Sequence, residues 1–291
     1  MNRILIIDGN NLAHRATHKF NLTTGDGRSS SVVYGFVYIL SSLLTRLPSD
    51  EVFVVFDGSR SKHRIGMLPD YKQRTSRFTD KEHSEFVDQI DWLKNNLGLA
   101  NCKVVHDSKM EADDLIYIIT KLYPKSMKTI VSSDKDFIQL LGPKVKIYNP
   151  FKNKIVHTEN VVSEYGFSEK ECVDYLSLDG DKSDHIPGVP GMGPVRIREF
   201  LDTFGSVPNF LEAEDRGKFS KYEGIIRSIY TRNKSLIGLR SFFIKFIKIK
   251  EIPIARTQWD EEKFNSKLLR DFQIRLFTKP GVVKVFKRLN V

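Results

Sequence analysis

The segment Val52–Gly58 reads VFVVFDG and joins a short run of β-branched and aromatic residues directly to an acid. Such a run predicts a β-strand, so Asp57 lies where that strand ends. The run Ile4–Ile7 is followed by an acid in the same way, and Thr129–Val131 is followed three residues later by another. The sequence therefore predicts several strands that end beside carboxylates.

Helical patterns alternate with these strands. Val32–Leu47 and Lys81–Leu97 have helical periodicity, a further strand is predicted at Lys103–Val105, and a helix begins within KMEADD at Lys109–Asp114. This βαβα order predicts an α/β fold with a mostly parallel central sheet covered by helices on both faces. Ligands of such sheets bind at the carboxyl ends of the strands, so we expect the functional site there.

The second half of the chain has a different pattern. From about Thr158 the strand signals fade, and helices are predicted at Glu169–Leu178, Val195–Phe204 and Gly224–Leu239. We expect an α/β core over residues 1–160 and a helical region over residues 161–291. Within the first region, the segment 59–77 is strongly basic and holds six Lys or Arg and one acid. It is too long for an ordinary connection, so it is functional or disordered, and its position after Asp57 favours function.

Composition limits the partners. The chain has 291 residues, is 40% hydrophobic and 28% charged, and carries a formal net charge of +10, which predicts a soluble globular protein with a polyanionic partner. Nucleic acid is favoured over an acidic membrane because no basic amphipathic anchor stands out; a solvated basic surface without a partner remains the alternative. Cys102 and Cys172 lack CxxC spacing and predict buried thiols in a reducing compartment. No signal peptide or membrane-length apolar run occurs, so we expect a cytoplasmic protein without membrane contact.

Acidic side chains converge on the predicted edge of the sheet. Four follow strands and three stand in the first turn of the helix that begins within KMEADD; they are Asp8, Asp57, Asp134, Asp136, Glu111, Asp113 and Asp114. Acids in a first turn often only complement the helix dipole, and KMEADD alone leaves that interpretation open. Seven like charges in a small volume, however, repel strongly unless cations neutralise them. Mg²⁺ and Mn²⁺ prefer such oxygen ligands, and paired metals catalyse phosphodiester hydrolysis.

Other chemistries fit less well. The chain has no GxSxG, GxxxxGK[ST] or HExxH motif, and its seven histidines lack ligand spacing. The stretch LDGDKSDHIPGVPGMGPVRI at Leu178–Ile197 is not a dinucleotide fingerprint, because Arg196 replaces the third glycine and no strand is predicted before it. A glycine-rich turn that opens a helix can instead present backbone N–H groups to phosphate, although a simple interhelical loop is the alternative. Ten Lys or Arg between residues 216 and 250 also suit a phosphate-binding surface.

These motifs together resemble the structure-specific 5′-nuclease superfamily, which includes flap endonucleases, the 5′-nuclease domains of bacterial DNA polymerase I and phage 5′-3′ exonucleases. The motifs are IIDGNNLAHR at residue 6, VVFDG at 54, DYK at 70, EADD at 111, SSDKDFIQLL at 132 and LDGDKSDHIPGVPGMGP at 178. The chain is most similar to the phage and stand-alone bacterial members. The resemblance implies a PIN-like core with a helical arch near residues 59–95 and a helix-three-turn-helix near residues 180–205.

The resemblance also implies roles for individual residues. Its two-metal carboxylate shell, for Mg²⁺ with Mn²⁺ as a substitute, would consist of Asp8, Asp57, Glu111, Asp113, Asp114, Asp134, Asp136, Asp181 and Asp184. Lys72 would contact the scissile phosphate, Tyr71 would stack on an unpaired base, and Arg15 would reach a phosphate. Arg74 is the candidate for the second arch cation, because Thr75 stands at the family's arginine position. Duplex DNA, with K⁺ in the turn, would contact Gly188, Gly191, Gly193, Arg196 and Arg198.

The implied function is a Mg²⁺-dependent 5′ nuclease, acting as flap endonuclease and 5′-3′ exonuclease in replication and repair. Its partners would be flapped or branched duplex DNA with a 5′ single strand, RNA primers and replication proteins, and it would act as a monomer in a bacterial or phage-infected cytoplasm. His185 stands where the family usually has Asn, and Val195 where Lys often follows the turn. A PIN-type ribonuclease and a non-catalytic branched-DNA binding protein with structural metal remain the alternatives.

Overall fold

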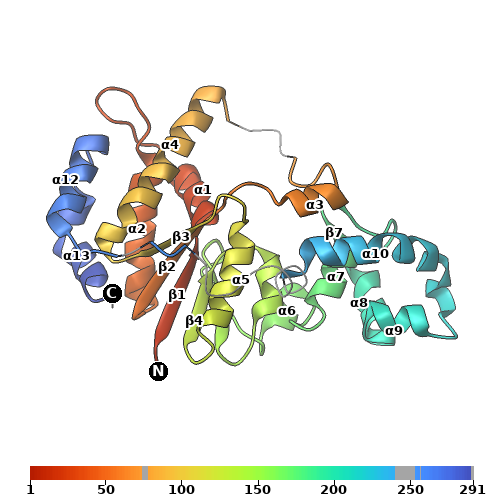
Figure 1. The fold of residues 1–291 in the computed structure, drawn as a ribbon. Coiled ribbons are helices and arrows are strands. Elements are labelled where there is room, and N and C mark those ends of the chain that lie inside the picture. Colours follow the sequence, from red (N-terminus) through yellow and green to blue (C-terminus); the bar gives the residue numbers. More distant parts are fainter. Residues whose placement is uncertain (74–77, 240–252, 256, 290–291) are drawn as a thin grey trace.

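The computed structural model describes residues 1–73, 78–239, 253–255 and 257–289. Its centre is a six-stranded sheet in the order β3-β2-β1-β4-β5-β6 (Figure 1). The strands are β1 Arg3–Asp8, β2 Glu51–Phe56, β3 Lys103–His106, β4 Met127–Val131, β5 Val145–Asn149 and β6 Lys154–Val156. The first five are parallel and β6 is antiparallel to β5. The predicted mostly parallel sheet is confirmed.

The two faces of the sheet are covered by different helices. Successive strand residues point to opposite faces, so Leu5 and Ile7 belong to one apolar core, and Ile4 and Ile6 to the other. The first core is closed by α1 Gly9–Lys19, α2 Ser31–Arg46, α4 Asp80–Asn96 and the 3₁₀ turn η1 Leu97–Ala100. The second is closed by α5 Ala112–Leu122, η2 Lys135–Leu140, α6 Val161–Tyr165 and α7 Cys172–Asp179.

The helical region continues the second core. It contains α8 Pro194–Phe204, α9 Val207–Glu212, η3 Gly217–Tyr222 and α10 Glu223–Ile237, which pack around a cluster of aromatic rings from Phe200, Phe210 and Phe219. A short antiparallel ladder, β7 Gly180–Asp181 with β8 Ile186–Pro187, stands between α7 and α8. The sequence did not predict this ladder. α3 Lys62–Met67 lies close to α10.

The expected boundaries need one correction at the C-terminal end. The helices α12 Glu261–Phe272 and α13 Pro280–Lys287, with η5 Leu276–Thr278 between them, lie away from α10 (Figure 1). α13 and η5 pack against α2, and α12 packs against η1. Phe264, Phe277 and Phe286 are fully buried in the first core. An apolar helix face predicts burial but not the partner, which is why the sequence assigned these residues to the helical region.

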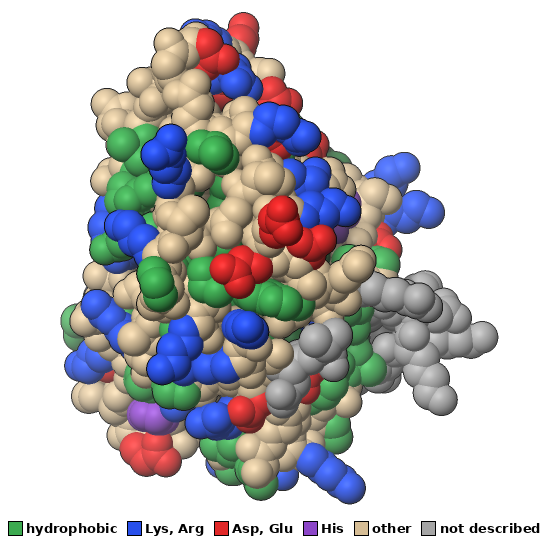
Figure 2. All heavy atoms as spheres, turned by 90° about the vertical axis from the view of Figure 1, so that its left-hand side faces the viewer, with side chains coloured by type: hydrophobic (Ala, Val, Ile, Leu, Met, Phe, Trp, Pro, Cys, Tyr) green, Lys and Arg blue, Asp and Glu red, His purple; other side chains and the backbone are tan. Residues whose placement is uncertain are grey.

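The surface over these C-terminal helices is basic without forming a single patch. Figure 2 shows this side of the molecule, with Lys and Arg side chains spread among hydrophobic ones and a few acids. Within the described residues, no helix is both long enough and apolar enough to cross a membrane.

Candidate metal centre

The carboxyl ends of β1 and β2 hold the first two acids. Asp8 is 7% exposed, and its two oxygens accept hydrogen bonds from the Asn11 N–H (3.0 Å) and the Ser132 hydroxyl (2.8 Å). Asp57 accepts from the Ala112 N–H at 2.8 Å. Its own N–H donates to the Asn10 side chain at 3.0 Å. The start of α1 and the start of α5 therefore hold both carboxylates at the sheet edge.

Glu111 and Asp113 enter the same edge from the start of α5. Glu111 is the N-terminal cap residue of α5 and is 3% exposed. One of its oxygens accepts from the Ser61 N–H at 2.8 Å, and the other lies 2.8 Å from the Lys72 ammonium. The Asp113 carboxylate lies 3.4 Å from the same ammonium.

The remaining acids come from the loop after β4 and from the β7–β8 turn. Asp134 caps η2 by accepting from the Asp136 N–H at 2.9 Å. In the turn, Asp181 accepts from the Ser183 N–H at 2.7 Å. The Asp184 carboxylate lies 3.8 Å from the Lys72 ammonium, and its carbonyl accepts from the Lys72 N–H at 3.1 Å. The helical region thus contributes acids to the edge of the α/β core.

The acids perturb one another. Burial, followed by the negative charge of Asp113, raises the pKa of both Asp8 and Asp57. Desolvation and the carboxylate of Asp134 raise the pKa of Asp136 well above its usual range. Burial also acts to raise the pKa of Glu111, but the Lys72 and Arg64 cations outweigh it and lower that pKa to about 2. The set therefore carries more negative charge than the protein's own cations neutralise.

This donor set fits hard divalent cations. All of its side chains offer carboxylate oxygen, which Mg²⁺ and Mn²⁺ prefer, and none offers sulfur or imidazole. Among the residues that the structure describes, no three such side chains already close around a single point. The carboxylates are gathered along one edge, with the Lys72 ammonium among them.

Lys72 combines an unusual backbone conformation with a side chain that lies among the carboxylates. Its φ is +50°, in the left-handed region that non-glycine residues seldom occupy. The turn is held by the Lys72 N–H bond to Asp184, so the side chain points into the carboxylates instead of into solvent. Its predicted contact with a scissile phosphate remains a prediction.

Asp114 does not join the other acids. Its two oxygens accept hydrogen bonds from the Arg64 guanidinium at 2.7 and 2.8 Å. The Asp114 and Arg64 side chains are 1% and 2% exposed. Both Asp114 oxygens face Arg64 and not the other acids, so we leave Asp114 out of the proposed ligand set.

The predicted stacking role of Tyr71 is wrong. Its ring is 2% exposed and belongs to the second apolar core, and its hydroxyl donates to Glu111 at 3.0 Å. A ring held inside the core cannot receive a base. Arg74, the other predicted arch residue, lies outside the described residues. Arg15 lies on α1 with its guanidinium 4.7 Å from the centre of the Phe151 ring.

The glycine-rich turn has mixed geometry. A Cβ on Gly188 would lie 2.2 Å from the Asp179 carbonyl oxygen, so this position requires glycine. Gly191 has φ +76°, where most side chains are strained. Gly193 caps α8 and has open space beside it. Arg196 donates to the Tyr222 hydroxyl at 2.8 Å. Arg198 is bound to Glu171 at 2.7 Å, so its predicted contact with DNA would have to displace an ion pair.

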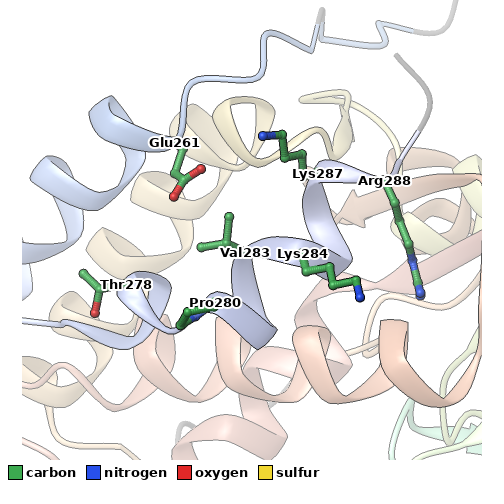
Figure 3. Close-up of a pocket in the computed structure, with 7 residues that line it drawn as sticks. All are labelled: Glu261, Thr278, Pro280, Val283, Lys284, Lys287 and Arg288. Atoms are coloured by element: carbon green, nitrogen blue, oxygen red, sulfur yellow. The ribbon is translucent and has the colours of Figure 1, made fainter.

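A surface hollow lies away from these acids. It has a volume of about 490 Å³, and Figure 3 shows its lining, which includes Glu261 from α12, Val283 and Lys284 from α13, and Arg288 just after α13. It holds one acid, whereas the sheet edge holds eight, so we place the candidate site by its chemistry and not by the depth of a hollow.

Two residues at the site edge were not singled out from the sequence. Arg64 was only one of the six cations of segment 59–77, and no local pattern marked it as the buried one. Phe151 follows β5, a strand that was not predicted from the sequence, so its place at this edge was not predicted either.

The chain is similar in sequence to known proteins. The family model of the 5′-3′ exonuclease N-terminal, resolvase-like domain matches residues 3–166. A 5′-3′ exonuclease of Aquifex aeolicus is 33% identical over 215 residues, which cover 73% of each chain. DNA polymerase I of Mycobacterium tuberculosis is 30% identical over 94% of this chain. The chain spans only 31% of the length of that polymerase.

Solved structures share the fold. The T5 D15 protein co-crystallised with metal ions superposes with a TM-score of 0.71 at 18% identity, over 99% of this chain and all of that one. Flap endonuclease-1 of Methanococcus jannaschii gives a TM-score of 0.65 at 16% identity, over 98% of this chain and 92% of that one. At such low identity these two structures establish the fold alone.

Proposed function

The chain belongs to the 5′-3′ exonuclease family, and from this premise we propose that it is a metal-dependent nuclease that hydrolyses phosphodiesters near the 5′ ends of DNA. The observation that carries the proposal is the meeting of acids from separate parts of the chain. Asp8 and Asp57 end neighbouring strands, Glu111 and Asp113 open α5, and Asp184 reaches the same Lys72 ammonium from the β7–β8 turn.

Eight carboxylates would hold the metal ions. They are Asp8, Asp57, Glu111, Asp113, Asp134, Asp136, Asp181 and Asp184. Bound Mg²⁺ ions would supply an activated water and stabilise the leaving oxygen. The chain's own contribution is orientation: backbone N–H groups at the starts of α1 and α5 fix Asp8 and Asp57, so these ligands need little rearrangement.

Lys72 would act on the substrate. Its ammonium lies among the carboxylates, where a phosphate bound to the metals would also lie. A positive charge at that point stabilises the negative charge that develops on phosphate during attack. We therefore assign to Lys72 the contact with the scissile phosphate, with Arg74 or another arch cation as its companion.

The substrate would be duplex DNA with a 5′ flap or a 5′ end, including RNA primers. Support comes from the excess of cations and from the backbone N–H groups of the glycine-rich turn before α8. In this proposal K⁺ joins the turn to a duplex phosphate, and the protein acts as a monomer.

The test incubates a 5′-labelled flap duplex with the protein in Mg²⁺ or in EDTA, beside two variants. Asp134→Asn should lose activity by about a hundredfold or more, because it removes charge from the metal site. Glu262→Gln removes an exposed carboxylate on α12 and should cleave like the wild type. Absence of any Mg²⁺-dependent product would refute the nuclease. Equal cleavage by Asp134→Asn would refute the placement of the site.

A further inference from the structure

An exposed aromatic ring stands at the same edge of the sheet as the acids. Phe151 lies in the turn between β5 and β6, and 55% of its surface is exposed. The turn begins where the parallel strand β5 ends. The Ser132 N–H donates to the Tyr148 carbonyl at 3.2 Å, and the Ser132 hydroxyl donates to Asp8. The end of β5 is therefore level with the metal centre.

The turn holds Phe151 in a fixed position. The Asn149 side chain is buried, and its oxygen accepts from the N–H groups of Phe151 and Lys152, both at 3.0 Å. At the other end, Asn153 has φ +53° and accepts from Arg46 at 2.7 Å and from the Tyr148 hydroxyl. Single exposed apolar residues are common and need no function. Phe151 differs because hydrogen bonds hold both ends of the turn that carries its ring.

A cation accompanies the ring. The Arg15 guanidinium lies 4.7 Å from the centre of the Phe151 ring. Arg15 belongs to α1, whose N-terminal cap is the metal-centre residue Asp8. Aromatic rings for base stacking and cations for the backbone are the two components of surfaces that bind unpaired nucleic acid.

Two routes give the separation from the metal centre. Along α1, seven residues at about 1.5 Å each place Arg15 roughly 10 Å beyond Asp8. Across the sheet, two strand spacings of about 4.8 Å separate the end of β1 from the end of β5, again roughly 10 Å. At about 3.4 Å per nucleotide of a strand, that distance corresponds to about three nucleotides.

We propose that Phe151 and Arg15 form a nucleobase-stacking subsite for the nucleic acid cleaved at the metal centre. The ligand is a base with an uncovered face, about three nucleotides from the scissile phosphodiester. Phe151 stacks on this base, and Arg15 binds the adjoining phosphate. The inference rests on the proposed nuclease function, because only a bound nucleic acid supplies such a base at this edge.

The test measures binding without cleavage, by fluorescence anisotropy of a labelled flap duplex in EDTA. Phe151→Ala should weaken binding about tenfold, the value for loss of one base–aromatic stack. Phe151→Trp should restore wild-type affinity, because it keeps the stacking surface. The control Leu269→Ala truncates an apolar side chain on α12 that is 46% exposed and should bind like the wild type.

A series of abasic substrates identifies the base. Each substrate lacks one base, at positions one to six from the cleavage point on either side. A single abasic position, about the third, should weaken wild-type binding about tenfold and leave Phe151→Ala unchanged, because both changes remove the same stack. Independent losses at every position, or wild-type affinity of Phe151→Ala, would overturn the inference. So would an absence of nucleic-acid binding.

The two proposals can fail separately. A protein that cleaves the flap duplex, and whose Phe151→Ala variant binds normally, retains the nuclease function and loses the stacking subsite. A protein that binds through Phe151 in EDTA but gives no product in Mg²⁺ retains the subsite and loses the nuclease function.

Discussion

Arg64 is the largest fully buried charged side chain in the described structure. It joins the base of the predicted arch to α5 through two hydrogen bonds to Asp114, and it lies 3.2 Å from Glu111. A buried ion pair adds little net stability over an apolar pair, but removal of one partner leaves a charge without compensation. Arg64 therefore helps to fix the position of Glu111, but loss of Arg64 or of Asp114 would destabilise the fold.

Arg64→Gln should lower the free energy of unfolding by about 3–5 kcal/mol, because Asp114 would stay buried without its partner. The double variant Arg64→Met with Asp114→Leu should lose much less, since position 114 then carries no charge and the buried Glu111 keeps its Lys72 partner. Urea unfolding followed by circular dichroism measures both. Arg227→Gln, which breaks an exposed pair with Glu223 on α10, should cost about 1 kcal/mol or less. Equal losses in the single and double variants would contradict this account.

Lys72 should compete with divalent cations for the same oxygens. Lys72→Met removes the ammonium that lies 2.8 Å from Glu111 and 3.4 Å from Asp113. We expect Mg²⁺ to bind the free protein on the order of tenfold more tightly, because a like charge has left the site. Flap cleavage should nevertheless fall. Calorimetry measures the Mg²⁺ affinity, with Lys62→Met on α3 as the exposed control. An unchanged Mg²⁺ affinity of Lys72→Met would contradict this prediction, because it would show that the ammonium does not compete with the metal.

At the scale of elements, the strands with acids after them were predictable because a run of β-branched residues and its chemistry are both local. β1, β2, β3 and β4 appear where the sequence predicted them. The helices α2, α4, α8 and α10 begin and end within a few residues of the predicted bounds. β5 and β6 were not predicted, so the position of Phe151 in the turn between them could not be predicted either.

The β7–β8 ladder shows the limit of local patterns. Each of its strands has two residues, which is too short for any periodicity. What holds the ladder is long-range: the buried Asn233 side chain on α10 donates to the carbonyls of Ser177 and Pro187 at 2.9 and 2.8 Å. Tyr71 was misjudged for a related reason, since its burial depends on packing that the segment 59–77 does not reveal.

Gly188 and Gly193 provide a matched test of this element. Gly188→Ala should destabilise the protein by about 1–3 kcal/mol and weaken metal binding, because its methyl group would meet the Asp179 carbonyl and displace the ladder that carries Asp181 and Asp184. Gly193→Ala has open space and φ −80°, so its stability should match the wild type. Urea unfolding compares the two. A stable Gly188→Ala variant would mean that the turn can shift without cost.

At the scale of the molecule, the resemblance drawn from the motifs is confirmed, and so is the α/β fold. The sequence could indicate which acids share an edge, because parallel strands end together. It could not indicate that Asp114 turns away from that edge toward Arg64, since neighbouring residues on a helix point in different directions. The C-terminal helices were misassigned because their partners, α2 for α13 and η1 for α12, lie far away in the chain.

The shared negative charge predicts how metal and pH act together on stability. Burial and neighbouring acids raise the pKa of Asp8, Asp57 and Asp136 above the ordinary value of 3.8. The folded state then binds more protons than the unfolded state, so without metal these groups reduce stability as pH rises from about 4 through their folded-state pKa values. Glu111, with its pKa lowered to about 2, acts oppositely and below this range.

Mg²⁺ should therefore raise the melting temperature more at pH 8 than at pH 5. At higher pH the ligands are deprotonated and repel one another. A bound cation then removes this repulsion, and its binding does not have to displace protons from the carboxylates. Thermal denaturation with Mg²⁺ or EDTA at the two pH values measures the difference. The Asp134→Asn variant should show a smaller increase at pH 8. An equal or larger increase at pH 5 would contradict the prediction.

The return of α13 to α2 has a consequence for synthesis on the ribosome. The apolar side of α2 emerges early, yet the phenylalanines that cover it, ending with Phe286, emerge about 240 residues later. At a rate of about 5–20 residues per second, that side waits roughly 12–50 seconds for its cover. During this interval the nascent chain exposes the apolar side of α2, which favours aggregation. A chaperone that shields this side would raise the yield of native protein.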